Sequence, residues 1–186
     1  MSIKEIIDLY YPEGTPLRDI YLRHSRAVAE FALALNRECE LNLPSDEVEN
    51  AAMLHDIGIF LTRAPGIHCN GGEPYIAHGY LGADLLRKHG FDERYARVCE
   101  RHTGVGIMPN EIREQQLPLP ADRVYVPETM LEKLVCYADK FYSKSGSMQM
   151  KSRKEVVTSI ERFGKENAVR FSKLEKALGV KFDKIS

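Results

Sequence analysis

The 186-residue sequence lacks several features that would assign a protein to a class at once. No apolar run approaches the roughly 20 residues that a membrane-spanning helix needs. Residues 1–11 carry three charges and no signal-peptide pattern. The formal net charge of -1 argues against a nucleic-acid polymer held by bulk electrostatic attraction. We therefore expect a cytoplasmic protein with neither a membrane nor a nucleic-acid polymer as its partner.

Paired cysteines and internal repeats are missing as well. The four cysteines are widely separated and form no CxxC motif: Cys39, Cys69, Cys99 and Cys136. This spacing favours reduced thiols over a structural disulfide or a cysteine zinc site. The chain is long enough to bury a sizeable core, and no repeat or second domain is evident. We expect one domain over residues 1–186.

Helical periodicity runs through almost every long segment. Thr15-Pro16 is typical of a helix start, and Thr129 with Glu132 forms a capping box. We predict an all-α fold with helices near residues 1–11, 15–37, 45–58, 73–89, 92–102, 129–142, 152–163 and 165–178. The last two are expected to contribute packing only, through Val156, Ile160, Phe163, Phe171, Leu174 and Leu178. Residues 62–73 are predicted as loop, and 109–127 as a long surface connection that could serve as a lid.

The segment from Ala51 to Ile59 is the most informative part of the chain. It places His55 and Asp56 side by side inside an otherwise apolar run. Burying such polar groups without partners costs roughly 2 to 7 kcal/mol each. A divalent metal ion would provide the partner, because imidazole nitrogen and carboxylate oxygen are both good ligands.

Four further ionisable residues fall on or beside apolar helix faces. They are His24, His78, His102 and Asp139. With His55 and Asp56 they make six candidate ligands, a number that suits two divalent ions. Because only two of the six are carboxylates, the loaded site would be positively charged and would favour a phosphate. The other two histidines, His68 and His89, are expected in a loop and at a helix end, without such a role.

The order H…HD…H…H…D, with Ile57-Gly58 after the HD pair, resembles the HD-domain superfamily of metal-dependent phosphohydrolases in its HDIG-bearing form. The similarity extends from about Leu17 to Tyr142, and His78 with His102 matches the branch that binds two metals. Two stretches are similar to the bacterial enzymes that hydrolyse diadenosine tetraphosphate: residues 102–104, and residues 131–133 leading to 138–139.

The resemblance implies a compact HD-domain helical bundle over about 17–142, with two additional C-terminal helices in 152–178. It implies that His24, His55, Asp56 and Asp139 hold one metal, and that Asp56 bridges to a second, completed by His78 and His102. Asp56 and His55 are then the catalytic residues, and a metal-bound hydroxide attacks phosphorus. Iron or manganese is expected, with zinc, cobalt, nickel or magnesium as alternatives.

One position departs from the family pattern. Many two-metal relatives have a lysine directly after the HD-x-G run, where it can contact phosphate, and this chain has Ile59. The phosphate contact is then expected elsewhere. The candidates are Lys140, which adjoins Asp139, with Arg63, Arg123 and Thr103, and with Arg23 and Lys144 as further cations.

Three functions follow from the ligand set. The first is a phosphohydrolase acting on a nucleotide, such as a dinucleoside polyphosphate or mononucleotide, or on another small phosphate ester. The second is an HD-domain diiron oxygenase that cleaves a C–C or C–P bond, since the same ligand order occurs there. The third is a regulatory HD module without turnover, which the presence of all six ligands disfavours.

Overall fold

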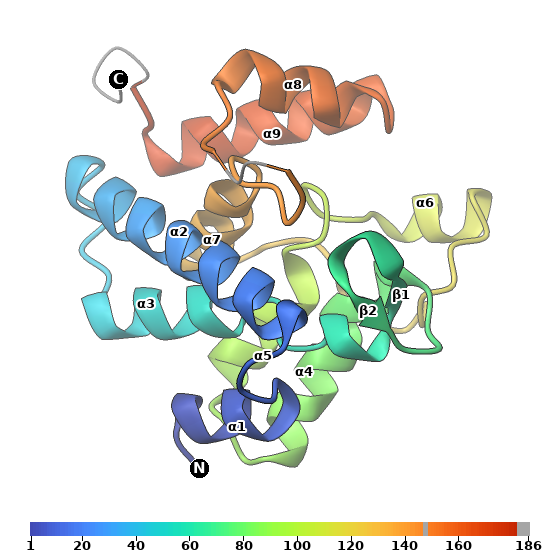
Figure 1. The fold of residues 1–186 in the computed structure, drawn as a ribbon. Coiled ribbons are helices and arrows are strands. Elements are labelled where there is room, and N and C mark those ends of the chain that lie inside the picture. The colour runs from blue at the N-terminus through green and yellow to red at the C-terminus, as the bar shows by residue number, and fades with distance from the viewer. Residues whose placement is uncertain (147–148, 182–186) are drawn as a thin grey trace.

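The computed structural model describes residues 1–146 and 149–181. Nearly all of the regular structure in these residues is helical, which confirms the predicted all-α fold. Helix α1 lies at one end of the molecule and helices α8 and α9 at the other (Figure 1). The helices are α1 (Ile3–Tyr10), α2 (Pro16–Glu38), α3 (Ser45–Leu54), α4 (His78–Lys88), α5 (Glu93–Arg101), α6 (Pro109–Glu114), α7 (Met130–Asp139), α8 (Arg153–Glu161) and α9 (Lys165–Leu178).

Capping residues fix the beginnings of the longer helices. The Thr15 side chain accepts a hydrogen bond from the Arg18 N–H at 3.3 Å, and Pro16 follows as the first residue of α2. A complete capping box joins Thr129 and Glu132 at the start of α7. These side chains satisfy backbone N–H groups that a helix start leaves unpaired. The local signals in the sequence therefore predicted these two helix starts correctly.

Two buried clusters hold the helices together. One joins α2, α3 and α7 to the C-terminal helices, and it includes Phe31, Leu35, Leu134 and Phe171. The other joins α1 to the HD segment, α4 and α5, and it includes Tyr11, Tyr21, Ile57 and Leu86. Helix α2 contributes Tyr21 to the second cluster and Val28 to Leu35 to the first, so His24 lies between them. This places His24 deep inside the molecule, where it is 1% exposed.

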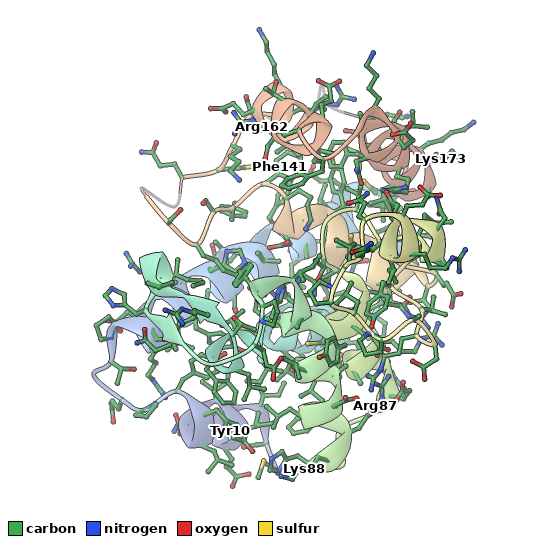
Figure 2. The ribbon with its side chains drawn as sticks, turned by 90° about the vertical axis from the view of Figure 1, so that its right-hand side faces the viewer. Tyr10, Arg87, Lys88, Phe141, Arg162 and Lys173 are labelled. Carbon is green, nitrogen blue, oxygen red and sulfur yellow. The ribbon has the colours of Figure 1, made fainter. Side chains whose placement is uncertain are left out.

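The C-terminal helices pack as a pair on α7. The Tyr137 ring on α7 stacks on Phe171 of α9, with ring centroids 5.0 Å apart. Phe171, Leu174 and Leu178 are buried as predicted. Phe163 is not: α8 ends at Glu161, so Phe163 lies in the turn before α9 and is 78% exposed. The exposed surface of the pair includes the charged residues Arg162 and Lys173 (Figure 2).

The two predicted loops contain more structure than expected. In the first, β1 (Arg63–Ala64) pairs antiparallel with β2 (Cys69–Asn70), and the 3-10 turn η2 (Pro65–Ile67) joins them. Further 3-10 turns, η1 (Ile59–Leu61) and η3 (Tyr75–Ala77), flank this hairpin. The connection 109–127 contains α6 and has a small core of its own, made by Ile112, Leu119 and Tyr125.

Candidate metal centre

The six predicted ligands come together, although fewer of them lie within helices than expected. His24 lies within α2, and Asp139 is the last residue of α7. Helix α3 ends at Leu54, so His55 caps it and Asp56 follows in the turn. His78 is the first residue of α4, and His102 caps the end of α5. None of the six is more than 8% exposed.

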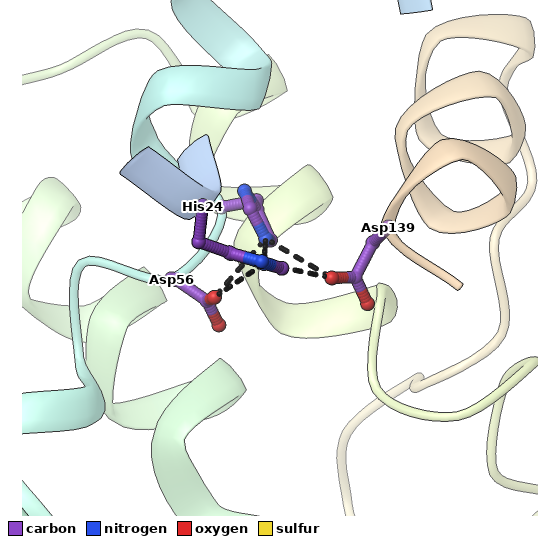
Figure 3. Close-up of side chains that lie close together, drawn as sticks. His24, Asp56 and Asp139 are labelled. Atoms are coloured by element: carbon purple, nitrogen blue, oxygen red, sulfur yellow. Dashed lines mark hydrogen bonds and ion pairs between the residues drawn. The ribbon is translucent and has the colours of Figure 1, made fainter. Parts of the chain in front are cut away.

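The first group of possible ligands surrounds His24 (Figure 3). Its Nε2 atom lies 3.0 Å from Oδ1 of Asp139 and 3.2 Å from Oδ2 of Asp56. The Nε2 atom of His55 lies 3.3 Å from that of His24 and 3.1 Å from Oδ2 of Asp56. Two imidazoles and two carboxylates thus point at one location.

The second group consists of His78, His102 and Asp56. The Nε2 atoms of the two histidines are 3.0 Å apart. Oδ1 of Asp56 lies 3.5 Å from the first and 3.3 Å from the second. Asp56 therefore turns one carboxylate oxygen to each group, Oδ2 to the first and Oδ1 to the second.

The histidine tautomers show that the second group fits a cation. Nδ1 of His78 lies 2.6 Å from the Tyr75 carbonyl oxygen, and Nδ1 of His102 lies 2.7 Å from that of Cys99. A carbonyl only accepts, so each Nδ1 must carry the hydrogen. Burial lowers the pKa of His78 to about 3, with His102 adding to the effect, and burial also lowers the pKa of His102. Two neutral rings then aim Nε2 lone pairs at each other, and a metal ion between them removes the repulsion.

The separations also agree with shared coordination. Two donors bonded to one ion at about 2.1 Å lie roughly 3.0 to 3.4 Å apart in octahedral or tetrahedral geometry. Across the two groups, six pairs of donor atoms are 3.0 to 3.3 Å apart and two further pairs are 3.5 Å apart. His55 has the same anchoring, since its Nδ1 lies 2.6 Å from the Ala52 carbonyl oxygen. The donor set fits divalent metal ions.

Two lysines compensate the buried carboxylates. The ammonium of Lys144 lies 2.7 Å from Oδ2 of Asp56, and that of Lys140 lies 2.6 Å from Oδ2 of Asp139. Burial opposes ionisation of both carboxyls, yet these ammonium groups help to hold the pKa of Asp56 and Asp139 well below the usual value. Burial likewise opposes protonation of His55, but the two carboxylates raise its pKa to about 9.

Gly58 brings the HD turn close to α4. A Cβ atom at this position would lie 2.3 Å from the His78 carbonyl oxygen and 2.5 Å from the Gly82 nitrogen. Only a glycine therefore allows the turn that carries Asp56 to approach the start of α4, where His78 lies. Ile59, which stands where many relatives have lysine, is fully buried in the second core cluster.

A pocket of about 440 Å³ adjoins the first ligand group. Asp139 belongs to both the ligand group and the pocket wall. The wall carries the lysines 140, 144 and 151, the serines 143, 145 and 159, and the tyrosines 75 and 142, together with Ala64, Gly66, Ile67, Val156 and Ile160. None of the residues that line this pocket belongs to the connection 109–127. The prediction that this connection serves as a lid over the site therefore gains no support.

Only some of the predicted phosphate contacts lie at this pocket. Lys140 and Lys144 line it, whereas Arg63 and Arg23 are exposed elsewhere. Thr103 and Arg123 also lie outside the described wall. Arg123 instead bonds to Asp84 and Glu100 at 2.7 and 2.9 Å, and thereby ties the long connection to α4 and α5. The sequence missed Lys151, Tyr75 and the residues of α8, because no spacing rule connects them to the ligands.

The remaining histidines lie away from the centre, as predicted. His68 is exposed in the hairpin loop with a left-handed backbone, φ 60°. His89 Nε2 lies 2.7 Å from the Tyr10 hydroxyl and links α4 to α1.

Comparison with known families agrees with this geometry. The family model described as HD domain matches residues 21–143, a range that contains all six residues of the two groups. This chain belongs to the HD domain family. Its resemblance to the superfamily is thereby confirmed, and with it the expectation of a helical HD fold.

Two proteins with similar sequences carry other names. The chain is 35% identical over 175 residues to a tRNA (cytidine(56)-2'-O)-methyltransferase of Thermoplasma volcanium, covering 92% of this chain and 45% of that protein. It is 39% identical over 123 residues to an uncharacterized protein of Methanocaldococcus jannaschii, covering 63% of each. The chain thus spans less than half of the methyltransferase.

Solved structures with the same fold include an HD domain from a phosphodiesterase. The PgpH HD domain of L. monocytogenes superposes with a TM-score of 0.56 and 16% identity, over 98% of both chains. The same domain in complex with cyclic-di-AMP gives a TM-score of 0.55 and 17% identity, over 95% of this chain and 92% of that one. At this identity the likeness concerns the fold.

No helix among the described residues has the length and apolar character to cross a membrane.

Proposed function

We propose that this protein is a metal-dependent phosphohydrolase acting on a nucleotide, either a mononucleotide or a dinucleoside polyphosphate, or on another small phosphate ester. The observation that carries the proposal is the position of Asp56, whose two carboxylate oxygens face two separate groups of histidines. A shared carboxylate of this kind suits a centre with two metal ions.

The proposed cofactor is a pair of divalent ions, iron or manganese first, because mixed imidazole and carboxylate donors suit transition metals. When bound, such ions stabilise charge developing on a phosphate and lower the pKa of coordinated water. His24, His55 and Asp139 would hold one ion with Asp56, and His78 and His102 the other. The backbone carbonyls behind His55, His78 and His102 orient these rings before any ligand arrives.

The pocket supports a small phosphorylated substrate. Lys140 donates to the His102 carbonyl oxygen at 3.0 Å as well as to Asp139, so its positive charge is fixed beside the centre. Tyr75, Ile67 and Tyr142 offer an apolar surface against which a base or another ring can lie. A volume of about 440 Å³ is in the range of small-molecule sites. The nucleotide bound to the PgpH HD domain is consistent with this class of ligand.

The experiment is phosphate and nucleotide release by metal-loaded protein, under anaerobic conditions, over a panel of mononucleotides and dinucleoside polyphosphates. We expect release by the parent, none by Asp56→Ala, and full release by His89→Ala, which alters a histidine outside the centre. Release by Asp56→Ala at the parent rate would contradict the proposal. Silence of the parent together with oxygen uptake by the iron-loaded protein would instead support a diiron oxygenase. Metal binding without either activity would support a regulatory module.

The methyltransferase similarity defines a second candidate, methyl transfer to tRNA. It covers 92% of this chain at 35% identity, but only 45% of the relative. We propose that the matching part of that relative is its HD unit and that methyl transfer depends on the rest of its length. Transfer of labelled methyl groups from S-adenosylmethionine to unmodified tRNA tests this directly. We expect none, and labelling by the parent would favour the second candidate.

A further inference from the structure

Part of the pocket wall comes from chain that follows the HD domain match. The match ends at residue 143, whereas Ser145, Lys151, Val156, Ser159 and Ile160 all line the pocket. The last three belong to α8, which the sequence pattern alone assigned to packing. These residues add to the HD centre a surface that this chain supplies outside the matched core.

Lys151 differs from the other two lysines of this pocket. Lys140 is paired with Asp139 and Lys144 with Asp56, so both charges are committed to carboxylates of the metal centre. None of the ion pairs recorded for residues 1–146 and 149–181 involves Lys151. Asp139, already paired with Lys140, is the sole carboxylate among the described residues that line the wall.

The surroundings of Lys151 leave its charge available to a ligand. Its backbone N–H donates to the Phe141 carbonyl oxygen at 2.8 Å, which fixes the start of this segment beside the end of α7. Glu155, one helical turn onward, accepts from the N–H and hydroxyl of Ser152 at 2.7 Å in the capping box of α8. Lys151 is half-buried, and this partial desolvation lowers the pKa of its ammonium group. A partly desolvated cation favours a charged acceptor.

We infer that Lys151 forms a second anion subsite, with the Ser159 hydroxyl on the same wall, and that the substrate carries a second negatively charged group besides the phosphate at the metal centre. This inference rests on the proposed function, and it narrows the substrate to phosphate esters with a further phosphate or carboxylate. The apolar side chains of Val156 and Ile160 lie in the same wall and would contact the uncharged part of the substrate.

Equilibrium binding tests the inference without requiring turnover. The ligands are AMP, which has one phosphate, and two compounds with two, α,β-methylene-ADP and adenosine 3',5'-bisphosphate. Each is titrated calorimetrically into metal-loaded parent, Lys151→Met, Lys151→Arg and Lys154→Met. Lys154 is the matched control, because it is an exposed lysine three residues away that does not line the pocket. Thermal unfolding of each variant establishes that it is folded.

We expect at least one of the two-phosphate ligands to bind the parent at least about tenfold more tightly than AMP, the contribution of one charge-assisted contact. Lys151→Met should lose that preference, while Lys151→Arg and Lys154→Met retain it. Equal binding of all three ligands by the parent, or a preference that persists in Lys151→Met, would overturn the subsite. Phosphate release by the parent is measured separately, so an absent hydrolase activity and an absent subsite give different results.

Discussion

The ammonium of Lys144 lies 2.7 Å from Oδ2 of Asp56, the same oxygen that faces His24 and His55. Lys144 comes from the segment after α7, and its side chain is 14% exposed. A fixed positive charge therefore occupies part of the space around the oxygen that we assign to the first metal ion. Two cations that approach one carboxylate oxygen compete for it.

Replacing Lys144 with methionine is therefore expected to raise the affinity for divalent metal several-fold, since the competing charge is removed. The same change should lower the melting temperature in the presence of a chelator, because Asp56 loses a buried counter-charge. Competition with a chromogenic chelator measures the first effect and thermal unfolding the second. Lys154→Met, on the outer side of α8, is the control, and an unchanged metal affinity in Lys144→Met would refute the competition.

His78→Ala should remove one metal and leave the other. His78 belongs to the second group only, whereas Asp56 belongs to both. We expect about half the parent's metal content in His78→Ala, which loses one ligand of the second group. We expect almost none in Asp56→Ala, which loses the carboxylate that both groups share. Elemental analysis of the purified variants decides, with His68→Ala as a histidine control. Complete loss of metal in His78→Ala would show that the two groups do not fill independently.

Gly58→Ala should destabilise the protein by about 1 to 3 kcal/mol or more, because the added methyl group would collide with the backbone of α4. The approach of 2.3 Å to the His78 carbonyl oxygen involves backbone, which cannot move aside as a side chain can. Chemical denaturation compares this variant with Gly72→Ala, where a Cβ atom meets nothing within 4 Å. If the two variants unfold at the same denaturant concentration, the tight contact between the HD turn and α4 is wrong.

Glu132 should make the fold sensitive to acid. Burial opposes its ionisation, but the N–H groups of Glu128 and Thr129, with Arg101 and Arg97, lower its pKa below the ordinary 4.5. A carboxylate with a depressed pKa stabilises the fold above its unfolded-state value and loses that contribution as the pH falls through the folded value. Glu132→Gln should therefore cost about 1.5 to 3 kcal/mol at pH 7. The gap to the parent should narrow below pH 4.5, as seen in unfolding curves at several pH values. A gap independent of pH would contradict the assignment.

The sequence predicted the helical fold and the residues that gather at its centre, for a physical reason. Ionisable side chains such as His24 and His78 fall at positions where helix periodicity predicts apolar ones, so their burial could be read from spacing alone. Spacing alone does not show that Asp56 faces both groups, and only the family resemblance implies it. The arrangement depends on α3 ending at Leu54 and on the close approach of Gly58 to His78 and Gly82, which are far from Gly58 in the sequence.

Contacts outside regular helices were harder to predict. Lys144 lies in an irregular segment, where no periodicity indicates direction, and yet it meets Asp56. Arg123 had the charge required for phosphate, but its partners Asp84 and Glu100 lie 39 and 23 residues away and hold it elsewhere. The sequence pattern predicts Phe163 on a packing face, but α8 ends at Glu161, because spacing alone fixes a helix end only to within a residue or two.

The division of the pocket wall has an evolutionary meaning. All six proposed ligands precede residue 140, while Lys151, Ser159 and the apolar side chains of α8 come later and outside the matched domain. The metal ligands and the proposed second anion subsite would then be encoded in consecutive stretches of one gene. Relatives that share the histidines but differ after residue 143 can differ in the second charged group that they bind while keeping the same metal ligands.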